Sequence, residues 1–106
     1  MKSKAIVVLT TVPNAEEAET LARKIVEAKL AVCVQILPAM KSIYVWENEI
    51  RTDAENLLLI KTLREKYVEL EKFIQINHSY DVPEIVALSA EDVSENYLGW
   101  LRNYLA

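Results

Sequence analysis

Glycine, proline and cysteine are scarce in this sequence of 106 residues. With one glycine and three prolines, the chain has little material for flexible linkers or long loops. Its single cysteine, Cys33, cannot form a disulfide within the chain, and a reducing compartment suits such a sequence. We therefore expect one folded domain that spans residues 1–106 and works in the cytoplasm.

Long apolar runs and basic clusters are also missing. The residues at 5–9 are too few for the core of a signal peptide, and no segment approaches the length of a membrane span. The chain carries 12 Lys and Arg against 16 Asp and Glu, which gives a net charge of −4. An acidic chain without a basic cluster does not attract phosphate backbones, so we expect neither a nucleic acid nor a membrane as partner.

Apolar residues, by contrast, are abundant at 52% of the sequence, which is ample for a packed core. Short runs rich in β-branched residues predict four strands, the second of them interrupted at Pro38. The strands are expected at residues 4–11, at 31–37 continuing over 42–46, around 57–60, and at 85–88.

Amphipathic spacing predicts three helices. Each follows a polar residue with a glutamate three positions later, the pattern of an N-cap pair. The pairs are Asn14 with Glu17, Thr62 with Glu65, and Asp92 with Glu95. The second helix is expected to end at Asn77, in the left-handed conformation that caps many helices.

A hairpin turn is expected at residues 47–49, with Asn48 best able to adopt a positive φ. The resulting order is βαββαβ followed by a C-terminal helix. This order predicts an α+β fold, the ferredoxin-like two-layer sandwich, in which an antiparallel sheet carries two helices on one face.

The predicted strands are apolar on both faces. Residues 6–9, 57–60 and 85–88 show no alternation with polar residues, although a strand with one face in water should alternate. Either the last helix or another subunit must cover the second face, because a monomer rarely exposes an apolar patch above about 300–600 Å². One short helix is too small, so we expect a symmetric oligomer. Large amphipathic side chains suited to its interface are Tyr44, Trp46 and Trp100.

The signatures of common activities of this fold are absent from the sequence. The strand at 55–61 has no aromatic residue for stacking RNA bases, and the loop at 10–15 has no thiol pair for metal transfer. The first helix opens with Glu16 and Glu17, which repel anions. Because no P-loop or catalytic triad spacing occurs either, we expect no enzyme and no organic cofactor.

Six segments together form a specific pattern that covers nearly the whole chain. They are residues 11–14, 30–34, 42–47, 55–62, 78–84 and 97–101. In these segments the sequence resembles the CutA family, the divalent-cation tolerance proteins. The resemblance implies a homotrimer packed through the sheets, and a link to copper binding and heavy-metal tolerance. It also implies similarity to the trimeric PII-type signalling proteins, which hold small ligands in clefts between subunits.

The sequence departs from the family pattern at four positions. Asn48 replaces the usual glycine of the turn, and Ser79 replaces a proline. Thr10 and Asn77 stand where some members have cysteine and histidine, which removes two metal ligands. These changes leave the expected trimer intact but weaken the case for copper.

His78 and Cys33 are the candidate metal ligands. An imidazole suits Cu(II), Zn(II) or Ni(II). The alternative is a histidine without a metal, whose protonated form is favoured by the partial negative charge at the C-terminus of a helix. Cys33 can act as a thiolate ligand or as a small buried hydrophobe. A shared site would need further ligands from nearby carboxylates or another subunit, so we expect copper or a similar divalent ion to bind only weakly.

Tyr80, Asp81 and Glu84 surround the rigid Pro83 and form a candidate ligand rim, unless this loop is simply solvated. Lys61, at the end of an apolar strand, can meet an anionic ligand, but an ion pair with Glu55 or Glu84 is the preferred reading.

Three functional hypotheses follow. The first is a cytosolic homotrimer associated with metal tolerance, without catalysis. The second is a sensor of the PII type that binds a small molecule or a protein partner. The third is an enzyme whose intersubunit cleft brings together two ionisable groups.

Overall fold

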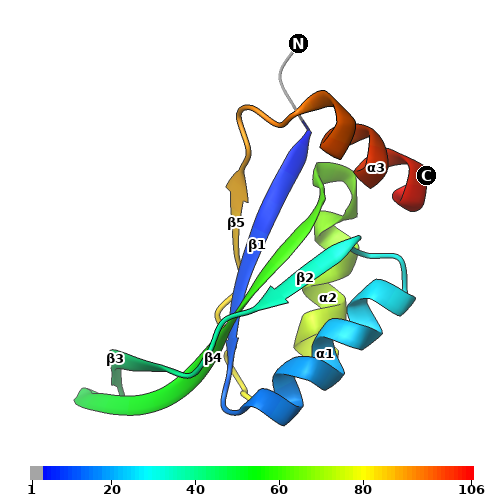
Figure 1. Cartoon of the computed structure of the whole chain (residues 1–106). Helices are drawn as coiled ribbons and strands as arrows, with labels where there is room; N and C mark the ends of the chain where they lie inside the picture. The colour runs from blue at the N-terminus through cyan, green and yellow to red at the C-terminus, as the bar shows by residue number, and fades with distance from the viewer. Residues whose placement is uncertain (1–3) are drawn as a thin grey trace.

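The computed structural model describes residues 4–106 (Figure 1). Residues 1–3, the start of the domain expected over residues 1–106, lie outside the described residues. A three-residue 3₁₀ helix, Arg64–Lys66, precedes α2. The other elements are β1 (Ala5–Val12), α1 (Ala15–Glu27), β2 (Cys33–Ile36), β3 (Met40–Trp46), β4 (Glu49–Leu63), α2 (Tyr67–Asn77), β5 (Val86–Ser89) and α3 (Glu95–Leu105).

The strands form one antiparallel sheet in the order β2-β4-β1-β5, with β3 paired to the first half of β4. The predicted mixed fold with an antiparallel sheet and three helices is therefore confirmed. Pro38 separates β2 from β3, as expected. Strand β4 is long because it pairs first with β3 and then with β1 and β2. The β3–β4 hairpin, residues 40–55, extends away from the body of the molecule and is called the arm below (Figure 1).

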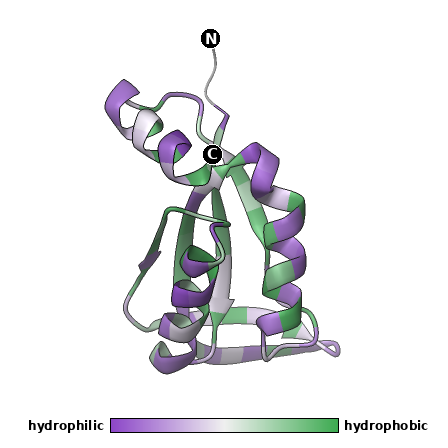
Figure 2. Ribbon diagram, turned by 90° about the vertical axis from the view of Figure 1, so that its right-hand side faces the viewer, coloured by the Kyte–Doolittle hydropathy of each residue, from purple (hydrophilic) through white to green (hydrophobic). Residues whose placement is uncertain are grey.

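Helices α1 and α2 cover one face of the sheet (Figure 1). Alternate residues of β1 and β4 point toward these helices, and fully burying each such aliphatic side chain stabilises the fold by roughly 1.5–3 kcal/mol. The central strands of the sheet are largely hydrophobic in Figure 2, whereas the helices have both hydrophobic and hydrophilic sides. Buried residues of this core include Val8, Leu21, Ile25, Leu58, Ile60, Leu70 and Ile74.

The opposite face of the sheet is also apolar, as predicted. Leu9 lies opposite Leu59 on this face, and Val86 and Leu88 of β5 are 44% and 50% exposed there. Helix α3 packs on Ala5 and Leu63 at one end of the sheet and leaves β5 uncovered. No helix within residues 4–106 combines the length and the apolar character that a membrane crossing requires.

One of the three predicted N-cap pairs is confirmed. The side chain of Asn14 accepts a 2.8 Å hydrogen bond from the amide of Glu17. Thr62, however, lies inside β4, where its hydroxyl donates to the carbonyl of Leu30 at 2.7 Å. The pairing of β4 with β1 continues to Leu63 and displaces the helix start to Tyr67. Ser94, not Asp92, precedes α3, and no side chain caps that helix within the described chain.

The arm turns at Glu47 and Asn48, whose φ angles are 52° and 63°. The positive φ predicted for Asn48 is confirmed, and Glu47 shares this conformation because two-residue hairpin turns often need it at both positions. Helix α2 ends at Asn77, as predicted, but the left-handed conformation expected for this residue is not found. Asn77 is in a helical conformation, and its side-chain amide donates to the carbonyl of Phe73 at 2.9 Å.

Candidate functional site

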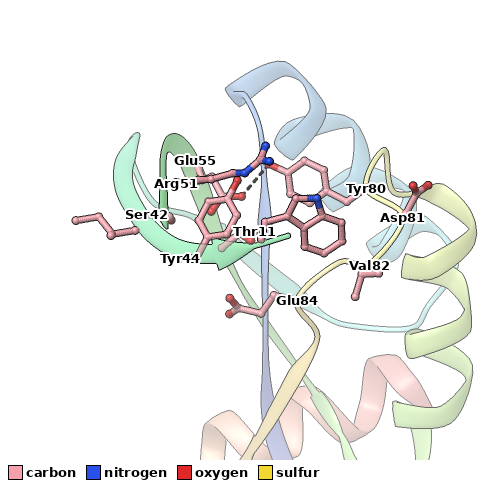
Figure 3. Close-up of a pocket in the computed structure, with 11 residues that line it drawn as sticks. Thr11, Ser42, Tyr44, Arg51, Glu55, Tyr80, Asp81, Val82 and Glu84 are labelled. Atoms are coloured by element: carbon pink, nitrogen blue, oxygen red, sulfur yellow. Dashed lines mark hydrogen bonds between the residues drawn. The ribbon is translucent and has the colours of Figure 1, made fainter. Parts of the chain in front are cut away.

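A pocket of about 600 Å³ lies between the arm and the loop that joins α2 to β5 (Figure 3). Its walls come from segments that are distant in the sequence, which is typical of a binding site held by a folded scaffold. The arm supplies Ser42, Ile43, Tyr44, Trp46, Arg51 and Glu55, the loop supplies Tyr80, Asp81, Val82 and Glu84, and β1 supplies Thr11.

Glu55 and Tyr80 connect the two walls of the pocket. The hydroxyl of Tyr80 donates a 2.8 Å hydrogen bond to a carboxylate oxygen of Glu55, whose residue surface is only 8% exposed. Burial raises the pKa of Tyr80 well above its ordinary value, and the hydrogen bond to Glu55 raises it further. The phenol is therefore a fixed donor toward the carboxylate.

Tyr44 makes a similar contact further along the arm. It donates to Asp53 on the neighbouring strand, and this hydrogen bond is the main cause of the raised pKa of Tyr44. Tyr44 pairs with Arg51 in the strand register, so a phenol and a guanidinium lie side by side on one wall. The guanidinium of Arg51 also forms an ion pair with the carboxylate of Glu47, with 3.5 Å between Nη2 and Oε1.

His78 fixes the position of Tyr80. Its Nε2 lies 2.8 Å from the carbonyl oxygen of Thr11, and its Nδ1 accepts a 3.0 Å hydrogen bond from the amide of Tyr80. A carbonyl can only accept and an amide can only donate, so the proton of the neutral ring is on Nε2. The two rings also contact each other, with centroids 4.9 Å apart. Both ring nitrogens are thus engaged within the protein.

Cys33 and His78 are not brought together. Cys33 is half-buried in β2, opposite Lys61, whereas Thr11, the partner of His78, lies opposite Leu57. These two positions of β4 are four residues apart, about 13 Å along a strand. Within the described part of the chain, no three His, Cys, Asp or Glu side chains are placed to hold a metal ion.

Lys61 does not line the pocket. Its ammonium donates to the side-chain oxygen of Gln35 at 2.7 Å, on the apolar face of the sheet. The expected ion pair with Glu55 or Glu84 is not formed among residues 4–106, because the side chain follows the cross-strand neighbour in β2. Of the four predicted rim residues, the structure therefore unites Tyr80, Asp81 and Glu84 and leaves Lys61 apart.

The three predicted interface residues lie on two separate surfaces. Tyr44 and Trp46 are on the arm and line the pocket, while Trp100 is on α3, half exposed and tilted against Tyr97. The arm and α3 are at opposite ends of the molecule (Figure 1).

Sequence reasoning missed the arm's contribution to the pocket. Arg51, Asp53 and Glu55 alternate along β4 and so share one face of the strand. That alternation is visible in the sequence, but a strand assigned at 55–61 includes only Glu55 of the three.

Comparison with known proteins identifies the family. A family model described as CutA1 divalent ion tolerance protein matches residues 6–104. The chain belongs to this family. The resemblance inferred from the sequence motifs is thereby confirmed.

Individual relatives agree. The chain is 47% identical over 96 residues to the divalent-cation tolerance protein CutA of Thermus thermophilus, covering 91% of this chain and 93% of the relative. It is 46% identical over 99 residues to the chloroplastic protein CutA of Arabidopsis thaliana, covering 93% of this chain but 54% of the relative. The chain thus spans about half the length of such plant relatives.

Solved structures match over the full fold. The crystal structure of CutA1 from Oryza sativa superposes with a TM-score of 0.94 at 44% identity, covering 99% of this chain and 96% of that one. The structure of the periplasmic divalent cation tolerance protein CutA from Archaeoglobus fulgidus gives a TM-score of 0.93 at 33% identity, covering 96% and 99%.

Proposed function

We propose that this protein acts without catalysis in divalent-ion tolerance, as a homotrimer that binds a small ligand in the pocket between the arm and the loop before β5. The observation that carries the proposal is the contact between Tyr80 and Glu55, which joins the two walls around a space large enough for a small molecule. His78 supports it by fixing Tyr80 from behind.

The trimer is proposed to form through the apolar face of a ferredoxin-like sheet. Val86 and Leu88 on that face and Ile43, Val45 and Ile50 on the arm are exposed in the single chain. An interface of about 1,600 Å², of which about 65% is apolar, gives roughly 25 kcal/mol of gross transfer energy, above association costs of about 4–15 kcal/mol. The pocket then becomes one side of a cleft between subunits, as the similarity to PII-type proteins implies.

The trimer is tested by light scattering after gel filtration. The expected mass is about three times the 12.1 kDa of one chain. A particle of single-chain mass at micromolar concentration contradicts it.

Ligand binding in the pocket is tested by a thermal-shift screen of chemically diverse small molecules. We expect some compounds to stabilise the wild-type protein but not the Tyr80→Phe or Glu55→Gln variants. The matched control is Glu16→Gln, which removes a carboxylate on α1, away from the pocket. Hits that stabilise all of these proteins equally argue against a pocket ligand.

Copper or a similar divalent ion is the second candidate ligand, favoured by the description of the family. We propose that it binds weakly, because both nitrogens of His78 already have partners within the chain and Cys33 lies elsewhere on the sheet. Carboxylates such as Asp81 and Glu84, or a second subunit, would have to complete the site.

The metal is tested by titrating copper against a chelator of known affinity, with His78→Ala and Cys33→Ala beside the wild type. A loss of stoichiometric binding in either variant supports a site at that residue. Binding unchanged in both variants rejects them as ligands.

The cytoplasm is the proposed location, since the lone cysteine needs no oxidising compartment. The names of two relatives record a chloroplastic and a periplasmic protein. Cell fractionation with an antibody against this chain tests the proposal, and recovery outside the cytoplasm contradicts it.

A further inference from the structure

Glu55 lies at the base of the arm with its charge almost removed from water. It is 8% exposed, and among the described residues its hydrogen-bond partner is the neutral hydroxyl of Tyr80. No cationic side chain within residues 4–106 forms an ion pair with it. A buried carboxylate is normally paired with a cation, so Glu55 presents an uncompensated negative charge to the pocket.

Arg51 lines the same wall nearer to the tip of the arm. Its Nε is buried and has no hydrogen-bond partner in the described chain. Its only ion pair there is with Glu47, whose side chain is 72% exposed, at 3.5 Å, and such exposed pairs contribute little. Buried donors are nearly always satisfied, so Arg51 lacks an acceptor that a ligand could supply.

The two groups have opposite charge and lie on the same face of one strand, with Asp53 between them. Their positions are four residues apart, about 13 Å along the backbone. The aromatic rings of Tyr44, Trp46 and Tyr80 line the same pocket. The pocket therefore offers a buried carboxylate, a guanidinium whose Nε has no acceptor within residues 4–106, and aromatic surface.

From this arrangement we infer that the pocket binds a small zwitterion, with an ammonium group against Glu55 and a carboxylate against Arg51. The inference rests on the proposed function, because it names the chemical class of the ligand for the same pocket. The aromatic rings contact the carbon chain and attract the ammonium group through their faces.

Ligands of a single charge fit less well. A simple anion would be repelled by Glu55, Asp81 and Glu84, which outnumber the one guanidinium of the lining. A simple cation would pair with Glu55 but leave the Nε of Arg51 without an acceptor. A ligand with both groups satisfies both ends.

The test compares three probes of similar length by calorimetric titration: 6-aminohexanoate, hexylamine and hexanoate. With the wild-type protein, we expect 6-aminohexanoate to bind roughly tenfold or more tightly than either singly charged probe, since each end adds a charge-assisted hydrogen bond. In Glu55→Gln its affinity should fall to that of hexanoate. In Arg51→Gln it should fall to that of hexylamine.

The controls are Glu49→Gln on the arm and Arg23→Gln on α1, which remove the same charges outside the pocket lining. They should leave all three affinities unchanged, and light scattering verifies that every variant keeps the wild-type mass. Equal affinity for the three probes, or binding of 6-aminohexanoate that survives both pocket substitutions, overturns the inference.

Together with the thermal-shift screen of the Tyr80→Phe and Glu55→Gln variants, this titration separates the inference from the proposed function. If 6-aminohexanoate fails while another compound binds in a manner that depends on Tyr80 and Glu55, the zwitterion is rejected and the pocket remains a ligand site. If no compound binds in that manner, both are rejected.

Discussion

The hydroxyl of Tyr80 donates a 2.8 Å hydrogen bond to the carboxylate of Glu55, 25 residues earlier in the chain. This contact ties the loop before β5 to the base of the arm. The carboxylate is buried, so loss of this hydrogen bond leaves a charged group without a donor. Such a loss lowers the free energy of unfolding.

Replacing Tyr80 with Phe should therefore destabilise the protein by about 1–3 kcal/mol. The matched control is Tyr67→Phe, which removes a 2.9 Å hydrogen bond to the half-buried Glu71 one helical turn away. The control should cost less, because water can reach Glu71 in place of the phenol. Urea unfolding at one fixed protein concentration measures both, and equal losses would contradict a special role for the Tyr80 contact.

Stability should also fall at alkaline pH. The pKa of Tyr80 is raised in the folded state, chiefly by burial, so the folded protein holds this proton more tightly than the unfolded chain. The resulting stabilisation is fully present below the ordinary tyrosine pKa of about 10 and is lost as the pH rises through the folded value.

Unfolding free energies measured at neutral pH and above pH 10 test this sign. The decline should be shallower in Tyr80→Phe than in the wild type. Phenolate absorbance, followed during the same titration, should show one tyrosine fewer that ionises at high pH in Tyr80→Phe than in the wild type. A stability that rises with pH in this range would show that the coupling has the opposite sign.

Thr10 and Thr62 form a natural comparison on adjacent strands, because both are fully buried. The hydroxyl of Thr62 donates to the carbonyl of Leu30, whereas that of Thr10 has no partner within residues 4–106. Thr10→Val should raise the free energy of unfolding by about 1 kcal/mol, since it removes an unsatisfied polar group. Thr62→Val should lower it by a similar amount, because Leu30 loses its donor. Thermal or urea unfolding measures both, and changes of the same sign would be inconsistent with these environments.

The core and the element order were predictable because they depend on local periodicity. Asn14 with Glu17 identifies the first helix, and the apolar runs identify the strands. Thr62 was misassigned because its pairing with Ile6 across the sheet is a long-range interaction that a local cap pattern cannot reveal. The competing strand pairing, not helix capping, decides where α2 begins.

The pocket was only half predictable for the same reason. Tyr80, Asp81 and Glu84 are neighbours in sequence and suggested a rim by themselves. Glu55 and Arg51 belong to it only because β4 continues beyond the sheet into the arm, which depends on tertiary pairing with β3. Lys61 lies outside this pocket because its ammonium donates to Gln35, a cross-strand neighbour that the sequence alone does not reveal.

His78 should behave as a positioning residue for Tyr80. At neutral pH we expect the ring to carry its proton on Nε2, because Nδ1 accepts from the amide of Tyr80. Nitrogen chemical shifts distinguish the two tautomers. In His78→Ala the amide of Tyr80 should exchange with solvent at least about tenfold faster, as expected for the loss of one hydrogen bond worth about 1.4 kcal/mol. Unchanged exchange would show that the loop is held by other contacts.

The apolar face of the sheet offers the sharpest test of the trimer. Leu88 is 50% exposed on that face, in β5, whereas Ile76 is exposed on α2 in the helical layer. If subunits pack through their sheets, Leu88→Lys introduces an unpaired charge into the interface at a cost of about 3 kcal/mol or more, which weakens assembly at least about a hundredfold. Ile76→Lys adds the same charge outside the interface and should leave the mass unchanged. Light scattering over a dilution series measures both variants. A trimer that tolerates lysine at position 88 but dissociates with lysine at position 76 would place the interface on the helices instead.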